Sequence, residues 1–242
     1  MKIIIIGGVA GGATTAARIR RVDETAEIIL LEKGKHISYA NCGLPYYIGG
    51  VIRDRERLFV QTPEAFARRF RVDVRTASEV TAIDVRRKEV TVRTSDGREY
   101  VETYDKLLLS PGASPVRPPL TGIDSRGIFT LRNVQDTDRI KDYVRQHQVR
   151  RALIVGGGFI GLEMAENLQH TGAEVAVVEM AAQVMGPIDF SMAALVHEHL
   201  LQKGVKLYLE QAVESFEETA SVVTVKFKSG ITIETDLVIL SI

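Results

Sequence analysis

The sequence predicts an α/β fold of two modules, each a parallel sheet with helices plus a small antiparallel meander. Two observations predict it. A short apolar run, a glycine cluster and a helix-forming segment occur in that order twice, starting near residues 3 and 152. Each copy then continues with the same succession of short strands, so the chain contains an internal repeat.

The first copy reads as strand, glycine turn, helix and strand, over residues 3–6, 7–12, 13–22 and 27–31. The second strand ends in Glu32, which lies 20 residues beyond Gly12. Glycines let the backbone approach a pyrophosphate at the helix N-terminus, while the acid accepts hydrogen bonds from ribose hydroxyls. This copy predicts a Rossmann-like dinucleotide-binding module, although Val9 replaces the middle glycine of the G-x-G-x-x-G pattern.

The second copy carries all three glycines of the pattern, Gly156, Gly158 and Gly161, between a strand at 152–155 and a helix at 162–171. Its next strand, 174–178, ends in Glu179. A chance glycine cluster could explain one such motif, but it does not explain two with the same flanking elements and an acid at the same place. We therefore expect two dinucleotide sites.

After each acid the repeat predicts a meander and a buried parallel strand, at 80–85, 89–94, 99–103 and 105–110, then at 212–216, 222–228, 231–235 and 236–241. Residues 136–146 read as a helix that leads into the second module. A further amphipathic helix at 190–203 is expected to place Leu195, Leu200 and Leu201 in the core. His197 and His199 are two residues apart, face different ways and cannot share a metal.

The only cysteine, Cys42, lies in the stretch S-Y-A-N-C-G-L-P-Y-Y-I-G-G at 38–50. A lone cysteine is most often a small buried hydrophobe. Here Pro45 stands where a helix takes its first residue, which places Cys42 at a helix N-terminus. The helix dipole favours the thiolate there, and the thiolate is the nucleophilic form. The sequence therefore favours a reactive Cys42.

Cys42 also lies where the two copies differ in length. The distance from Gly7 to Asp105 is 98 positions, against 80 from Gly156 to Asp236, and nearly all the extra residues follow Glu32. We interpret 33–62 as a specialised insertion in a first module at 1–115, followed by a connection and linker helix at 116–150 and a second module at 151–242. A purely structural insertion is the alternative.

Composition narrows the function classes. The 242 residues contain 31 basic and 31 acidic side chains, so no net field steers the chain to nucleic acid or membrane. One cysteine excludes a disulfide scaffold and fits a reducing compartment. The opening apolar run is too short for a signal peptide or a membrane span, so we expect a cytoplasmic protein.

Thr14, Arg18 and Arg21 are spaced four and three residues apart and share one face of the first helix. One interpretation is a solvated face with cations near the helix C-terminus. The other is phosphate recognition beside Cys42.

Taken together, these residues resemble the single-cysteine pyridine nucleotide-disulfide oxidoreductases, a family that includes coenzyme A-disulfide reductases, persulfide or polysulfide reductases, NADH oxidases and NADH peroxidases. The most specific element is S-Y-A-N-C-G-L-P-Y, which is similar to the form S-F-x-N-C-x-x-P-Y of coenzyme A-disulfide reductases. Oxidases and peroxidases usually lack that Pro-Tyr, and the peroxidases have a histidine where this chain has Ala10. Both differences favour a disulfide or persulfide substrate.

The resemblance implies an FAD site and an NADH site, with NADPH as a possible second donor. The implied FAD contacts are Gly7, Gly8, Val9, Ala10, Gly11, Gly12, Glu32, Lys33, Val80, Ser110, Pro111, Gly112 and Arg132. The implied NADH contacts are Gly156, Gly157, Gly158, Phe159, Ile160, Gly161, Glu163 and Glu179, with Glu163 at the flavin–nicotinamide junction. No arginine follows Glu179, which favours NADH over NADPH because a 2′-phosphate would meet negative charge.

Coenzyme A contacts of the family match Thr14, Arg18, Arg21, Ser38 and Asn41, whereas a further family lysine falls at Phe70 and has no match. Family members also continue with the second half of the FAD domain and a dimerisation domain, which are not among these 242 residues. The resemblance implies a homodimer for the full-length protein and a small-molecule substrate, with no metal and no nucleic acid.

The resulting hypothesis is electron flow from NADH through FAD to Cys42, which reduces coenzyme A disulfide, a coenzyme A persulfide or polysulfide. An NADH oxidase that cycles Cys42 through a sulfenic acid is one alternative. A non-catalytic nucleotide-binding fragment is another.

Overall fold

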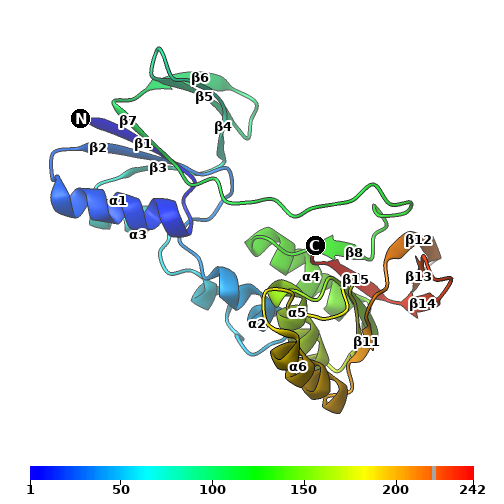
Figure 1. Cartoon of the computed structure of the whole chain (residues 1–242). Coiled ribbons are helices and arrows are strands. Elements are labelled where there is room, and N and C mark those ends of the chain that lie inside the picture. Colours follow the sequence, from blue (N-terminus) through cyan, green and yellow to red (C-terminus); the bar gives the residue numbers. More distant parts are fainter. Residues whose placement is uncertain (220–221) are drawn as a thin grey trace. The chain divides into compact units, whose positions relative to one another are not determined.

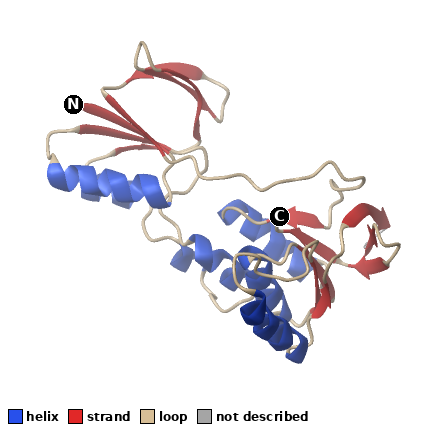
Figure 2. Cartoon of the chain, viewed as in Figure 1, coloured by secondary structure: helices blue, strands red, loops and turns tan. Residues whose placement is uncertain are grey.

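The structure is a computed structural model that describes residues 1–219 and 222–242. By its contacts the chain forms two compact units. The first contains Met1–Ala40 and Glu56–Ala113, and the second contains Asn41–Arg55 and Ser114–Ile242. Figures 1 and 2 show the elements of each unit.

The first unit has three layers: helices, a parallel sheet and a meander (Figure 1). The parallel sheet has the order β3-β2-β1-β7 and the antiparallel meander the order β4-β5-β6. The elements are β1 (Lys2–Ile6), α1 (Ala10–Val22), β2 (Glu27–Leu31), η2 (Arg55–Leu58, at the unit boundary), α3 (Pro63–Phe70), β3 (Asp73–Arg75), β4 (Ser78–Asp84), β5 (Glu89–Thr94), β6 (Glu99–Thr103) and β7 (Lys106–Leu109).

Strand alternation explains these layers, since successive side chains of a strand point to opposite faces of a sheet. Ile3 and Ile5 of β1 pack with α1 and α3, and the cluster includes Ala16 and Phe66. Ile4 packs on the other face with residues of the meander strand β5. The isoleucines of β1 therefore pack on both faces of the sheet, as a central parallel strand requires.

The second unit repeats this plan with a parallel sheet of order β11-β10-β9-β15-β8 and a meander of order β12-β13-β14. Its elements are η1 (Asn41–Gly43), α2 (Leu44–Ile48), β8 (Ile128–Thr130), α4 (Val134–Gln146), β9 (Arg151–Val155), α5 (Phe159–His170), β10 (Glu174–Val178), α6 (Phe190–Gln202), β11 (Lys206–Tyr208), β12 (Val213–Thr219), β13 (Val222–Phe227), β14 (Thr232–Thr235) and β15 (Leu237–Leu240). The predicted fold class is confirmed.

Most predicted elements occur within a few residues of their expected bounds. The largest shifts are three residues: α1 and α5 begin earlier than predicted, at Ala10 and Phe159, and β12 ends later, at Thr219. In both loops the last glycine lies inside the first turn of the helix, whereas the sequence interpretation assigned all the glycines to the turn.

The core prediction for α6 is wrong at two of its three leucines. Leu195 and Leu201 are each 59% exposed, and Ala193 is the buried residue of the helix. Apolar residues occur nearly all round α6, so their spacing does not select one face. His197 has a structural contact, because its Nε2 accepts a hydrogen bond from the backbone N–H of Val184 at 3.1 Å.

Candidate functional site

The acid of the first module is held by backbone amides of its own loop. Oε2 of Glu32 accepts a hydrogen bond from the N–H of Gly8 at 2.7 Å, and Oε1 accepts one from the N–H of Gly34 at 2.7 Å. Each oxygen keeps a further acceptor position, because a carboxylate offers about four lone-pair sites. Glu32 is therefore fixed beside the glycine loop and can still accept from a ribose hydroxyl.

Glu179 makes the same pair of contacts in the second module. Its Oε2 accepts from the N–H of Gly157 at 2.7 Å and its Oε1 from the N–H of Ala181 at 2.9 Å. In both modules the partners are the second residue of the glycine loop and the residue two positions after the acid. The repeat thus extends from the sequence to individual hydrogen bonds.

The first and last glycines of each loop are required by the backbone. Gly7 and Gly156 have φ of +95° and +108°, values that favour glycine. A Cβ at Gly12 would lie 1.7 Å from the carbonyl oxygen of Gly7, and one at Gly161 would lie 2.1 Å from that of Gly156. Strand and helix therefore approach as closely as a dinucleotide-binding turn demands.

The middle position differs between the modules. A Cβ at Gly158 would meet no atom within 4 Å, so this glycine leaves open space at the N-terminus of α5. In the first module Val9 occupies the equivalent position, with φ of −89° and ψ of −104°. The residues present fit a dinucleotide on both loops, and the second loop keeps the open space that lets a pyrophosphate come close.

Other residues implied for FAD lie at the ends of elements in their own units. Lys33 follows β2 and forms an ion pair with Glu79 at 2.9 Å. Ser110, at the end of β7, donates its N–H to the carbonyl of Ile6 at 2.8 Å. Arg132 precedes α4 in the second unit, where its N–H donates to Asp136, the acid of the capping box of that helix. Their contacts with a cofactor stay predictions.

Cys42 is exposed and lies in η1, the single turn that leads into α2. The expected helix start is one residue too late, since Leu44 is the first residue of α2 and Pro45 the second. Next to the sulfur, Oδ1 of Asn41 is buried without a hydrogen-bond partner among the described residues.

The segment Asn41–Arg55 belongs by its contacts to the second unit, because α2 packs against α4 and α5 (Figure 1). The sequence analysis grouped it with the first module, and the functional domain boundaries stay a prediction. Gly49, just after α2, lies against α5 so closely that a Cβ there would be 2.6 Å from Oδ1 of Asn167. The segment that carries Cys42 thus packs against α5, the helix that follows the glycine loop of the second module.

Tyr46 links Cys42 to that helix. Cys42 and Tyr46 are four residues apart in consecutive helical turns, a spacing that places them on one face. The hydrogen bond with Glu163 and the negative charge of that carboxylate raise the pKa of Tyr46 to about 12. Oε2 of Glu163 is buried and has no partner among the described residues, so it can still accept a hydrogen bond.

The residues implied for coenzyme A divide between the two units. Thr14, Arg18 and Arg21 are exposed on α1, as the helical spacing predicts. Ser38 has φ of +46° and its N–H donates to the carbonyl of Gly8. Asn41 precedes Cys42 in the second unit. Each of these residues is therefore described within its own unit.

The sequence did not reveal the role of Arg20, which lies between Arg18 and Arg21 on α1. Its guanidinium donates at 2.8–3.1 Å to five backbone carbonyls, those of Asp23, Glu24, Ala26, Phe70 and Arg71. It therefore joins the end of α1 to the end of α3. No local pattern distinguishes it, because all its acceptors are backbone carbonyls and two of them, those of Phe70 and Arg71, lie 50 and 51 residues away.

Two features are absent from the described residues. Among residues 1–219 and 222–242, no helix has both the length and the apolar character needed to cross a membrane. The same residues include no group of three His, Cys, Asp or Glu side chains that could hold a metal ion.

Comparisons with known proteins agree with this geometry. The coenzyme A disulfide reductase of Staphylococcus haemolyticus is 40% identical over 239 residues, which are 98% of this chain and 53% of that protein. The reduced CoADR-RHD of Bacillus anthracis is 53% identical with a TM-score of 0.96, over 100% of this chain and 43% of that chain. A NAD-dependent persulfide reductase from A. fulgidus is 35% identical with a TM-score of 0.94, over 99% and 45%.

The chain spans about half the length of the curated relatives it matches. The model of one family, described as pyridine nucleotide-disulphide oxidoreductase, matches residues 1–242. The family predicted from the sequence is thereby confirmed. The chain belongs to the pyridine nucleotide-disulphide oxidoreductase family.

Proposed function

We propose that this chain is the electron-transferring part of a flavoprotein that uses NADH to reduce a disulfide or persulfide of coenzyme A, or polysulfide, at Cys42. One observation carries the proposal. The only cysteine of the chain is exposed on a helical segment that packs on the second nucleotide module, where α2 contacts α4 and α5. Sulfur and nucleotide module therefore form one structural unit.

The chemistry assigned to Cys42 is thiol–disulfide exchange. Its thiolate attacks one sulfur of the substrate disulfide, a mixed disulfide forms on Cys42, and the other sulfur leaves as a thiolate that takes a proton from solvent. Bound FAD would supply the two electrons that cleave the mixed disulfide, which regenerates the Cys42 thiolate and releases the second substrate sulfur as a thiol, and it would receive them from NADH. A single protein sulfur is sufficient for this cycle.

The substrate proposal rests on α1 and on the activities after which similar proteins are named. Arg18 and Arg21 are exposed on one face of α1, where guanidinium groups can bind phosphates of coenzyme A. Similar proteins are described as coenzyme A disulfide reductase and as NAD-dependent persulfide reductase. We expect a coenzyme A-derived acceptor rather than a protein disulfide.

Steady-state NADH consumption by the flavin-loaded protein tests this function. We expect fast turnover with coenzyme A disulfide or polysulfide and little turnover with oxygen alone. Equally fast turnover with oxygen alone would instead support the oxidase alternative. Nucleotide binding without any turnover would leave the non-catalytic alternative.

We also propose that NADH is preferred over NADPH. Two backbone amides fix the Glu179 carboxylate beside the glycine loop, and the residues that follow are Met180, Ala181 and Ala182, none of them basic. A 2′-phosphate would therefore meet a negative charge without a compensating cation. We expect kcat/KM to be at least about tenfold higher with NADH, a difference of about 1.4 kcal/mol. Equal or better efficiency with NADPH would contradict the preference.

A further inference from the structure

The helix that follows Cys42 is too short to hold its own position. α2 has five residues, Leu44–Ile48, and isolated helices shorter than about 12–15 residues are marginal in water. The placement of Cys42 must therefore come from tertiary contacts of this segment. Two charged residues of α4, Asp138 and Lys141, make such contacts from adjacent turns of one helix face.

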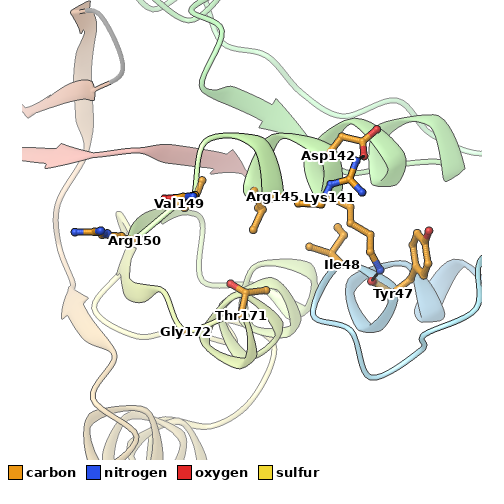
Figure 3. A pocket seen from close by; sticks show the side chains of 11 residues that line it. Tyr47, Ile48, Lys141, Asp142, Arg145, Val149, Arg150, Thr171 and Gly172 are labelled. Atoms are coloured by element: carbon orange, nitrogen blue, oxygen red, sulfur yellow. Dashed lines mark hydrogen bonds and ion pairs between the residues drawn. The ribbon is translucent and has the colours of Figure 1, made fainter.

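Lys141 holds the last turn of α2. Its Nζ donates a hydrogen bond to the backbone carbonyl of Tyr47 and lies 3.5 Å from the centre of the Tyr47 ring. Figure 3 shows the side chain reaching from α4 to Tyr47. Lys141 is half-buried, and burial lowers its pKa against the opposing effect of Asp138. A partly desolvated ammonium in this geometry makes a stronger cation–π contact than an exposed one.

Asp138 holds the far end of the same segment. Its carboxylate accepts from Arg55 in a forked arrangement, with Nε to Oδ1 at 3.0 Å and one terminal nitrogen to Oδ2 at 2.8 Å. Bidentate pairs of this kind fix geometry as well as adding energy. Asp138 therefore anchors the exit of the segment, while Lys141 anchors its helix.

Open space adjoins the Lys141 contact. A cavity of about 530 Å³ lies between α2, α4 and the end of α5, and its lining includes Tyr47, Ile48, Lys141, Arg145 and Thr171 (Figure 3). Ile48, in the same turn of α2, is buried and supplies apolar packing. Lys141 adds a directional polar contact at the backbone carbonyl of Tyr47, which apolar packing does not provide.

We propose that Lys141 is a positioning residue for Cys42. By holding the last turn of α2 against α4, it fixes the orientation of η1 and Cys42 at the other end of the same short helical segment. The inference rests on the proposed function, in which Cys42 is the group that reacts with the substrate. It assigns no contact between Lys141 and the substrate.

The test compares Lys141→Met with Arg145→Met in the full flavin-loaded chain. Methionine keeps most of the apolar stem of lysine but loses the charge. Arg145 lies one turn further along α4, lines the same cavity and pairs with Asp142 of its own helix, so it is the matched control. Lys141→Arg serves as the rescue variant, because arginine can keep both the ring contact and the hydrogen bond.

In Lys141→Met we expect kcat with the disulfide to fall about tenfold or more, as a misplaced reacting group predicts. The KM for NADH and the NADH-dependent reduction of ferricyanide, which needs no cysteine, should stay unchanged. Backbone amides of α2 should exchange with deuterium faster, while those of α5 should not. Arg145→Met should behave as the parent, and Lys141→Arg should recover most of the lost kcat.

An equal loss of disulfide and ferricyanide reduction would overturn the inference, because the defect would then be general. Unchanged kcat with the disulfide would overturn it as well, whatever happens to amide exchange. If the parent protein reduces no disulfide, the proposed function fails separately. The alkylation rate of Cys42 by iodoacetamide then decides, since a rate altered in Lys141→Met supports positioning and an identical rate refutes it.

Discussion

Glu32 and Glu179 are each oriented before any nucleotide binds. In both residues each carboxylate oxygen accepts one backbone N–H, so rotation of the side chain would break two hydrogen bonds. A net hydrogen bond to a charged group is worth about 1.5–3 kcal/mol, which is enough to keep one rotamer dominant. The acids therefore serve as fixed acceptors, and ligand binding does not have to order them.

Two glycines of the second loop have different roles: Gly158 leaves space for a ligand, and Gly161 is needed for folding. Gly158→Ala introduces a Cβ into open space, at a backbone conformation with φ of −79° that alanine adopts freely. We expect unfolding stability to change by less than about 0.5 kcal/mol. The KM for NADH should rise about tenfold or more, because the methyl group occupies the space that a pyrophosphate needs.

Gly161→Ala is the matched variant three residues later. Its Cβ would lie 2.1 Å from the carbonyl oxygen of Gly156, so the strand and the helix must move apart. We expect a loss of about 1–3 kcal/mol in unfolding stability, measured by urea denaturation. A Gly158→Ala protein that is equally destabilised, or that binds NADH as before, would contradict this division of roles.

For single residues, the sequence was informative where a residue belongs to a motif of near neighbours in the chain. The glycine loops, Glu32, Glu179 and Cys42 were all identified from spacing, and the predicted exposure of Arg18 and Arg21 follows from helical periodicity. Arg20 and Lys141 were not identified, because their acceptors are backbone carbonyls, some of them in distant segments. Any residue type supplies such a carbonyl, so no sequence pattern marks it.

At the scale of elements, an aspartate that follows each meander, Asp105 or Asp236, accepts backbone hydrogen bonds at the start of the first strand of its module. Burial by itself would raise the pKa of Asp236, but the amides of Arg150 and Arg151 and the Arg151 guanidinium outweigh it and lower this pKa below its usual 3.8. Asp105 accepts from the N–H of Lys2 in the same way. In each copy this contact holds the start of the first strand beside its partner strand, β1 beside β7 and β9 beside β15.

The lowered pKa of Asp236 makes this contact dependent on pH. A carboxyl with a depressed pKa in the folded state stabilises the fold above its unfolded pKa, and the stabilisation is lost as the pH falls through the folded pKa. We expect Asp236→Asn to lower the unfolding free energy by about 1–3 kcal/mol at neutral pH. The difference from the parent should vanish below about pH 3.

Urea denaturation at several pH values measures this effect. Asp142→Asn is the control, because the Asp142–Arg145 pair is mostly exposed and should contribute about 0–1 kcal/mol. A difference between Asp236→Asn and the parent that persists unchanged in acid would show that charge is not the cause.

Helix α1 carries the proposed contact with coenzyme A. Replacing Arg18 and Arg21 together by alanine should raise the KM for coenzyme A disulfide at least about tenfold, since each charge-assisted contact is worth about 1.5–3 kcal/mol before screening. The KM for polysulfide and that for NADH should hardly change. Arg20 must be kept, because it binds backbone carbonyls at the end of the helix.

A control with the same loss of charge is the double change Arg86→Ala and Arg87→Ala, at exposed residues between β4 and β5 of the same unit. Equal effects of the two double variants, or equal losses with both acceptors, would favour a merely solvated face on α1.

Elements with strong local signals were predicted better than those defined by tertiary contacts. β2, β5 and β6 occur at the predicted bounds, because apolar alternation and flanking turns define them. The short strands β3, β8 and β11 were not predicted, since three-residue segments at or near a sheet edge acquire their structure from the neighbouring strand. Leu195 and Leu201 were misplaced for a related reason, because the neighbours of α6 decide which face is buried.

At the scale of the whole molecule, the chain is a duplicated module to which one chemical feature has been added. The glycine loops correspond in the two copies, as do Glu32 with Glu179 and Asp105 with Asp236. Cys42 has no counterpart in the second copy. The segment that carries it follows the first acid in sequence but packs with the second module. The central claim is that this single sulfur receives the electrons that NADH delivers.

The most direct measurement is NADH-dependent reduction of coenzyme A disulfide by a flavin-loaded Cys42→Ser protein. We expect kcat to fall by a factor on the order of a thousand or more, because the nucleophile is removed. Ferricyanide reduction by NADH should stay within about twofold of the parent, since it needs no protein sulfur. A Cys42→Ser protein that binds flavin and still reduces coenzyme A disulfide at the parent rate would contradict the account.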